Sequence, residues 1–174
     1  VYCFRVRLCD DRPDRDFERF DTAALPRMAE LFRGKTGICD HQWSADRQVA
    51  RIFDTQVVRE DDGASCLMAE AYVLRTERNA DLIADIEGGI KKEVSVGCSM
   101  GRSVCSVCGA ENGACGHAKG QMYDGKLCFM ELKDPKDAYE WSFVAVPAQP
   151  RAGVVKRFGT EGPELRVLRK QAEM

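Results

Sequence analysis

Acyl transfer by a serine is the chemistry that the polar residues of this chain fit best, and its histidines limit how it could be done. The sequence holds only two, His41 and His117. Histidine is the usual base for a serine nucleophile because its pKa lies near neutral pH. His117 stands among cysteines and suits metal binding better, so a serine enzyme built on this chain would use His41. A structural, hydrogen-bonded His41 is the alternative.

Ser95 is the favoured nucleophile. It lies in Val94-Ser95-Val96-Gly97, where a hydroxyl interrupts an apolar run with the character of a strand. In a regular strand Gly97 faces the same side as Ser95 and leaves room for a substrate backbone. Ser99 shares that face and is the alternative nucleophile, whereas Cys98 falls on the opposite face. A strand serine bonded to backbone would fit the same pattern.

Glu140 is the favoured third member, the group that orients the imidazole and stabilises its charged form. It stands in Tyr139-Glu140-Trp141-Ser142, a charge beside a strongly apolar run. Asp40 is adjacent to His41, but neighbouring strand residues point to opposite faces. An exposed carboxylate at a strand end would fit the Glu140 pattern equally well. For the oxyanion hole, the backbone groups of Gly97 and Arg102 are suggested only as guesses.

A cluster of metal-ligating residues follows the serine segment. Cys105, Cys108 and Cys115 lie within eleven residues and His117 comes two positions later. Two tight turns could bring these four groups around one Zn²⁺, and Cys128 could replace His117 as the fourth ligand. Four protein ligands leave no open position, so this zinc would be structural and would organise residues 101–128. Disulfides or free thiols are the alternative.

Composition limits the other classes of function. The 174 residues are 44% hydrophobic, enough for one core, and 26 basic against 28 acidic residues give a net charge of -2. A near-neutral chain is not built to hold a nucleic-acid backbone, so a zinc-finger nucleic-acid protein is the weakest hypothesis. No apolar run reaches the roughly 18 residues of a membrane helix, so no membrane partner is expected. Five cysteines stand singly in apolar stretches and are expected in the core: Cys3, Cys9, Cys39, Cys66 and Cys98.

Strand patterns dominate the chain. Apolar alternation and β-branched residues predict strands over 1–9, 38–43, 48–59, 65–75, 93–100, 126–132 and 139–147. Two helices are predicted, one from Asp21 to Gly34 and one over 79–87, and residues 101–125 are predicted to be irregular. Hairpin signals such as Asp61-Asp62-Gly63 favour a mainly β fold, an antiparallel barrel-like sheet with peripheral helices of the α+β kind.

Three segments together resemble the prohead (capsid maturation) serine proteases of tailed phages, relatives of herpesvirus assemblin. They are Asp40-His41, Val94-Ser95-Val96-Gly97 and Glu140-Trp141-Ser142-Phe143-Val144-Ala145-Val146-Pro147-Ala148. The resemblance covers roughly residues 20–156, and the last segment is the most specific. It implies a herpes-protease-like β-barrel, here with an inserted cysteine-rich zinc knuckle. It also implies His41 as base, Ser95 as nucleophile and Glu140 as third member, although the herpesvirus relatives use a second histidine there.

The resemblance further implies what the protein acts on. It implies a protease domain over residues 1–158 that cleaves capsid and scaffold proteins, and itself, inside the procapsid in the host cytoplasm. A homodimer or higher oligomer is implied, and no cofactor is needed for catalysis. Residues 159–174 read as a polar tail, the root of a truncated scaffold-like segment. The alternative is a catalytically inactive, zinc-stapled capsid assembly or scaffold module.

Overall fold

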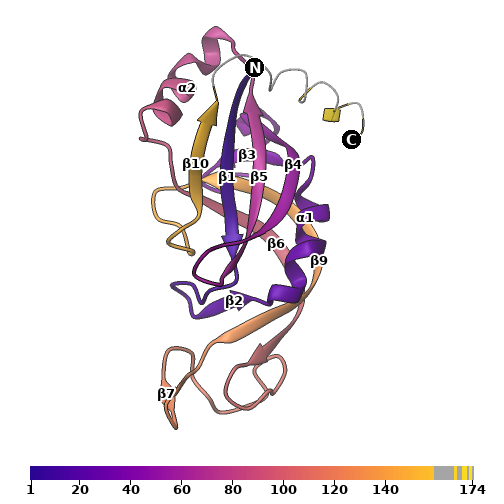
Figure 1. Ribbon diagram of the computed structural model, residues 1–174, viewed down its shortest axis with the longest axis vertical. Coiled ribbons are helices and arrows are strands. Elements are labelled where there is room, and N and C mark those ends of the chain that lie inside the picture. Colours follow the sequence, from indigo (N-terminus) through magenta and orange to yellow (C-terminus); the bar gives the residue numbers. More distant parts are fainter. Residues whose placement is uncertain (159–166, 168–169, 172, 174) are drawn as a thin grey trace.

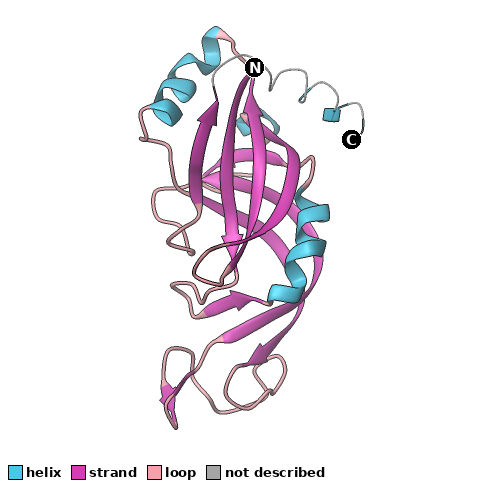
Figure 2. Ribbon diagram, in the orientation of Figure 1, coloured by secondary structure: helices cyan, strands magenta, loops and turns pink. Residues whose placement is uncertain are grey.

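The computed structural model describes residues 1–158, 167, 170–171 and 173, and it is mainly β with two short α-helices (Figures 1 and 2). The helices are α1 (Leu25–Phe32) and α2 (Ala80–Glu87), with 3-10 turns at Thr22–Ala24, Ala45–Arg47 and Glu77–Asn79. The strands are β1 (Tyr2–Asp10), β2 (Glu18–Phe20), β3 (Thr36–Cys39), β4 (Ala50–Arg59), β5 (Ser65–Val73), β6 (Val94–Cys105), β7 (Met122–Tyr123), β8 (Lys126–Leu127), β9 (Met130–Phe143) and β10 (Gly153–Phe158). The prediction of a mainly β chain with peripheral helices is confirmed.

The eight-stranded sheet is mixed, so the predicted all-antiparallel sheet is wrong. Its order is β10-β1-β5-β4-β3-β9-β2, with β6 paired to β9. Most neighbours are antiparallel, but β2 and β3 both run parallel to β9, along its start and its end respectively. Strand direction depends on partners about a hundred residues apart in the chain, and a local hydrophobic pattern carries no information about them.

Aromatic side chains from β1 and β9 form the centre of the core. Phe4 lies 6.1 Å from both Trp141 and Phe143, measured between ring centroids, and the last two rings are 5.3 Å apart. Helix α1 buries Leu25, Met28 and Phe32 against the same cluster. Each such side chain contributes roughly 1.5–3 kcal/mol on burial, so the core holds β9 firmly where Glu140 is placed.

Strand β9 is longer than predicted. The sequence predicted two strands, 126–132 and 139–147, whereas β9 runs without interruption from Met130 to Phe143 and residues 126–127 form the separate β8. Lys133-Asp134-Pro135-Lys136-Asp137 has the composition of a loop, yet Lys133, Pro135 and Asp137 pair with β6, and Pro135 stands at a shift in the register. A proline is tolerated where the ladder is already interrupted. Strand β6 likewise continues to Cys105, into a region predicted to be irregular.

Strand β10 was not predicted at all. The last strand predicted from the sequence ends at residue 147, but Gly153–Phe158 pairs with β1. Its start also bonds the beginning of β6: Val94 N donates to Ala152 O at 3.3 Å, and Val154 N to Lys92 O at 2.8 Å. Most of the predicted 159–174 tail lies outside the described residues, although Val167 is buried.

The cysteine lobe, residues 105–129, projects from the far end of the β6–β9 ribbon (Figure 1). It contacts β2 through Lys119, which forms an ion pair with Glu18 at 3.0 Å, and directly after the lobe Met130 N donates to Phe17 O at 2.9 Å. Within these 25 positions the buried residues are Cys105 and Cys128. The lobe therefore has no apolar core of its own.

Candidate active site and metal centre

His41 is held in a tight turn directly after β3. Asp40 and His41 have φ values of 53° and 51°, and Gln42 N donates to Cys39 O at 3.1 Å, the pattern of a type I′ turn. Two consecutive non-glycine residues in this conformation carry strain that the surroundings must offset. Strand β9 supplies the compensation, because Asp40 N donates to Phe143 O and His41 N donates to Ser142 Oγ, both at 3.0 Å.

The His41 ring contacts Glu140. Its Nδ1 lies 2.6 Å from Glu140 Oε1, and the carboxylate is almost completely buried, with 3% of the residue exposed. In a contact between an imidazole nitrogen and an ionised carboxylate, the nitrogen is the donor, which leaves Nε2 for a second partner. The imidazole is 40% exposed, so its free face is open to a substrate. This is the arrangement of a base and its orienting acid.

Ser142 and Trp43 complete the surroundings of the carboxylate. Ser142 Oγ donates to Glu140 Oε2 at 2.8 Å while it accepts the His41 amide, and the Trp43 indole N–H lies 3.4 Å from Oε1. Sequence reasoning gave neither residue a role. A signal was present for Ser142: it stands two positions after Glu140 and therefore shares its face of the strand.

Ser95 lies on the same face of the sheet as this pair. Across β6 and β9, Ser95 is opposite Ser142 and Gly97 is opposite Glu140. Val94 and Val96 point the other way and pack in or against the core. Within residues 1–158 no hydrogen bond joins the Ser95 hydroxyl to His41; the link between them is Ser142, which lies opposite Ser95 and accepts from the His41 amide.

Gly97 is required for a different reason from the one expected. The sequence suggested space for a substrate backbone, but the Glu140 carboxylate fills that space: a Cβ at Gly97 would overlap Glu140 Oε1. Because Gly97 has no side chain, the Glu140 carboxylate can occupy the space beside β6 at this position.

The other candidates near the serine are less suitable. Ser99 is opposite Asp137, beyond a shift in register. Burial raises the pKa of the Cys98 thiol to about 11, with Glu140 acting in the same direction, so the thiol is protonated at neutral pH. Arg102, the other suggested oxyanion donor, lies seven residues along β6 from Ser95, which corresponds to about 20 Å of strand.

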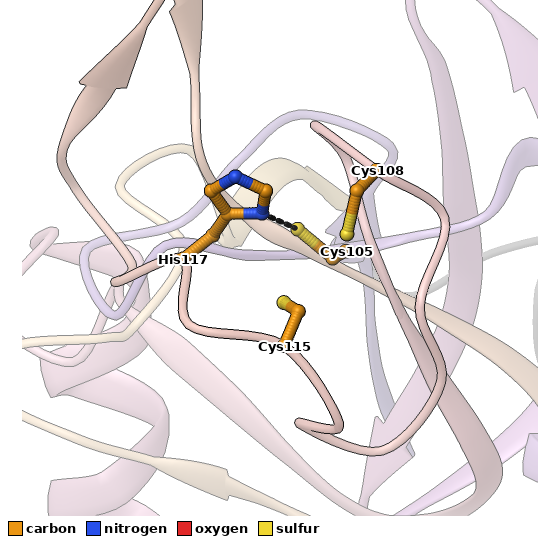
Figure 3. Close-up of side chains that lie close together, drawn as sticks. All are labelled: Cys105, Cys108, Cys115 and His117. Atoms are coloured by element: carbon orange, nitrogen blue, oxygen red, sulfur yellow. Dashed lines mark hydrogen bonds between the residues drawn. The ribbon is translucent and has the colours of Figure 1, made fainter.

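Four metal-ligating side chains meet in the cysteine lobe (Figure 3). The donor atoms of Cys105, Cys108, Cys115 and His117 all lie within 4.8 Å of one another, and His117 Nδ1 is 3.8 Å from Cys105 Sγ. Tetrahedral zinc with Zn–S bonds of about 2.3 Å holds its sulfurs about 3.8 Å apart. The cluster is thus of the right size and chemistry for one metal ion.

The local backbone of the lobe prepares Cys105 for a metal. Backbone N–H groups of Cys108 and Val107 are directed at its sulfur, and they lower the pKa of the Cys105 thiol to about 6 despite its burial. Gly109 N closes the turn by donating to Cys105 O at 2.9 Å. A thiolate is the form that ligates metals, and this turn favours it.

Cys128 provides a fifth donor on the inner side of the cluster. Its Sγ lies 3.9 Å from Cys105 Sγ, and burial raises the pKa of its thiol. The structure therefore offers both His117 and Cys128 as partners of Cys105. All nine cysteines lie within the described residues and all are free.

Comparisons with known proteins supply no further guide. No protein-family model, curated protein or solved structure matches the chain. Within the part of the chain that the structure describes, no helix has the length and apolar character needed to span a bilayer.

Proposed function

We propose that this chain is a serine endopeptidase of phage head maturation that cleaves capsid and scaffold proteins and itself. The observation that carries the proposal is the 2.6 Å contact between His41 Nδ1 and the buried Glu140 carboxylate, beside a serine on the same face. The resemblance of three segments to prohead proteases gives the substrate class and the place, the procapsid in the host cytoplasm. A homodimer or higher oligomer belongs to the same proposal.

The proposed reaction uses these groups in order. His41 Nε2 takes the Ser95 proton as Oγ attacks the scissile carbonyl, and Glu140 stabilises the imidazolium that forms. The imidazolium then protonates the leaving amine, and a water activated by the same base hydrolyses the acyl-enzyme. No metal takes part in these steps.

The proposed fold is a herpes-protease-like barrel. Its support is the pair of hydrogen bonds that link the residues at the start of β6 to those at the start of β10, because β10 ends the strand order and β6 is attached to it only through β9. The other support is an available edge: between Val96 and Gly101, the side of β6 away from β9 pairs with no strand in residues 1–158. A substrate peptide would add there as an extra strand beside Ser95.

The test of the protease is Ser95→Ala, expressed with and without the capsid protein. We expect cleavage of the capsid and scaffold proteins to disappear, with Ser99→Ala as the matched control that retains it. Persistent cleavage by Ser95→Ala would show that another residue is the nucleophile. Absence of cleavage by the wild type as well would favour the inactive assembly module, an alternative to which the missing Ser95–His41 hydrogen bond lends weight.

For the cysteine lobe we propose a structural Zn²⁺ bound by Cys105, Cys108, Cys115 and either His117 or Cys128. The protein purified from zinc-containing medium should hold one zinc per chain, and Cys105→Ser should hold none. Comparing His117→Ala with Cys128→Ala then identifies the fourth ligand, because only the variant that lacks it loses affinity for zinc. Wild-type protein without any metal would refute the site.

A further inference from the structure

A cavity of about 420 Å³ adjoins the His41–Glu140 pair. It lies between the loop after the His41 turn and the middle of β9, and its lining includes Ile38, Trp43, Ala138, Tyr139 and the Glu140 carboxylate. A volume of this size falls within the range of small-ligand sites and accommodates one large side chain. The neighbouring catalytic pair and the cavity thus share one residue, Glu140.

Two aromatic rings form an exposed wall of this cavity. Trp43 is 68% exposed and lies 5.2 Å from the Tyr139 ring, which is itself exposed. The Trp43 indole N–H is 3.4 Å from Glu140 Oε1, the same oxygen that accepts from His41. A tryptophan left in water beside a second aromatic is typical of a binding surface, because covering it releases water from a large apolar area.

The charges around the cavity favour neither a cationic nor an anionic occupant. Lys35 and Asp137 both line it and carry opposite charges, so neither sign is favoured overall. The carboxylate of Glu140 disfavours an acidic group near the catalytic pair. The apolar floor of Ile38 and Ala138, both buried, leaves a bulky uncharged side chain as the best fit.

We propose that this cavity is the subsite that receives a bulky apolar side chain, such as Phe or Leu, of the polypeptide substrate near its scissile bond. The inference rests on the proposed endopeptidase function, because the occupant is taken to be a substrate side chain. Trp43 is then a specificity-determining residue whose indole also contacts the carboxylate that orients the base.

Binding without turnover tests the subsite independently of catalysis. The chain has two tryptophans, and Trp141 is fully buried, so a change in solvent exposure reports on Trp43. The Ser95→Ala protein is titrated with N-acetylphenylalaninamide and N-acetylleucinamide, and with N-acetylalaninamide and N-acetylglutamic acid amide as controls. We expect a saturable blue shift of the emission with the first two only, and no shift in Trp43→Phe. Equal responses to the Phe and Ala amides, or no response, would overturn the proposal.

Selectivity in turnover tests the same subsite in the wild-type protein. For peptides that differ only by Phe or Ala at one position near the scissile bond, we expect at least about a tenfold preference for Phe in kcat/KM. Trp43→Ala and Tyr139→Ala should bring that ratio toward one, while Trp43→Phe keeps it. Val57→Ala, an exposed apolar residue on β4 outside the cavity lining, is the matched control and should also keep it.

The two measurements separate the possible failures. An unchanged Phe-to-Ala ratio in Trp43→Ala would overturn the subsite while leaving the endopeptidase intact. Absence of any cleavage by the wild type would overturn the endopeptidase, and the amide titration would still decide whether the cavity binds apolar side chains.

Discussion

Glu140 and the cysteine lobe lie on the same β6–β9 ribbon but are held in place in different ways. Near Glu140, each site residue alternates with a core residue: Trp141 lies between Glu140 and Ser142 and is fully buried. In the lobe, the buried residues are two thiols, Cys105 and Cys128. The region around Glu140 is positioned by packed apolar side chains, whereas the cysteine lobe has the residues of the proposed metal site in place of an apolar core.

This difference teaches what each region depends on. The His41–Glu140 pair should persist as long as the sheet is folded, because β9 supplies both its backbone and side-chain bonds. A segment of 25 residues without an apolar core cannot offset the entropy of ordering its backbone. Metal binding contributes free energy of folding directly in such segments. The proposed metal should therefore order the lobe, and the His41–Glu140 pair should be independent of that metal.

The largest expected effect is that of Glu140→Gln. A neutral amide does not stabilise the imidazolium, and it can hold His41 in the wrong tautomer, so kcat/KM should fall by about 10³–10⁴-fold. Glu131→Gln, on the same strand but in a surface ion pair with Arg19, is the control and should change it by less than about threefold. Steady-state kinetics on a capsid-derived peptide measure both. Full activity of Glu140→Gln would show that His41 works without this carboxylate.

Removal of the metal should act on one region only. After chelation, we expect backbone amides in residues 106–127 to lose protection from hydrogen exchange, while those of β1 and β5 keep theirs. Cys105→Ala should give the same result, and Cys66→Ala, a buried cysteine outside the cluster, should leave the lobe protected. Equal loss of protection in the lobe and in the sheet would contradict the independence of the two regions.

Ser142→Ala should give a moderate effect on both activity and stability. The substitution leaves Glu140 Oε2 and the His41 amide without their partner, which costs about 1–3 kcal/mol for buried groups. We expect a lower melting temperature and about a tenfold lower kcat/KM, since the His41 turn loses one of the two bonds that its backbone amides donate to β9. Ser142→Thr, which keeps a hydroxyl, should recover more of the activity than Ala. An Ala variant equal to wild type in both measurements would show that the hydroxyl is dispensable.

The smallest effect is expected from Cys98→Ala. With a thiol pKa of about 11, Cys98 holds almost no thiolate at neutral pH and cannot compete with Ser95 as nucleophile. Activity should stay within about threefold of wild type. Alkylation by iodoacetamide at pH 8 in the metal-free protein should label the exposed Cys108 well before Cys98. Loss of cleavage with folding intact would instead point to thiol chemistry.

Local patterns predicted what depends on neighbouring residues. The helices at 25–32 and 80–87, the hairpin between β4 and β5, and the cysteine cluster all follow from spacing along a short stretch of chain. The same reasoning missed β10 and divided β9 at Pro135, because a basic or proline-containing strand is stable only when a distant partner covers it. It also missed Ser142 and Trp43, whose roles exist only once β3 lies beside β9.

By itself the sequence determined the types of group available: one histidine outside the cysteine cluster, a serine and a glutamate in apolar strands, and thiols at ligand spacing. Tertiary structure alone decided that Nδ1 of His41 contacts the carboxylate of Glu140, 99 residues away. It also decided that Ser95 lies on the same face of the sheet as Glu140, and that the Cys128 sulfur lies beside that of Cys105. The physical reason is register. A shift of one residue between β6 and β9 would turn Ser95 to the face opposite Glu140 and Ser142, and the core packing of Trp141 and Phe143 holds the register that keeps them on one face.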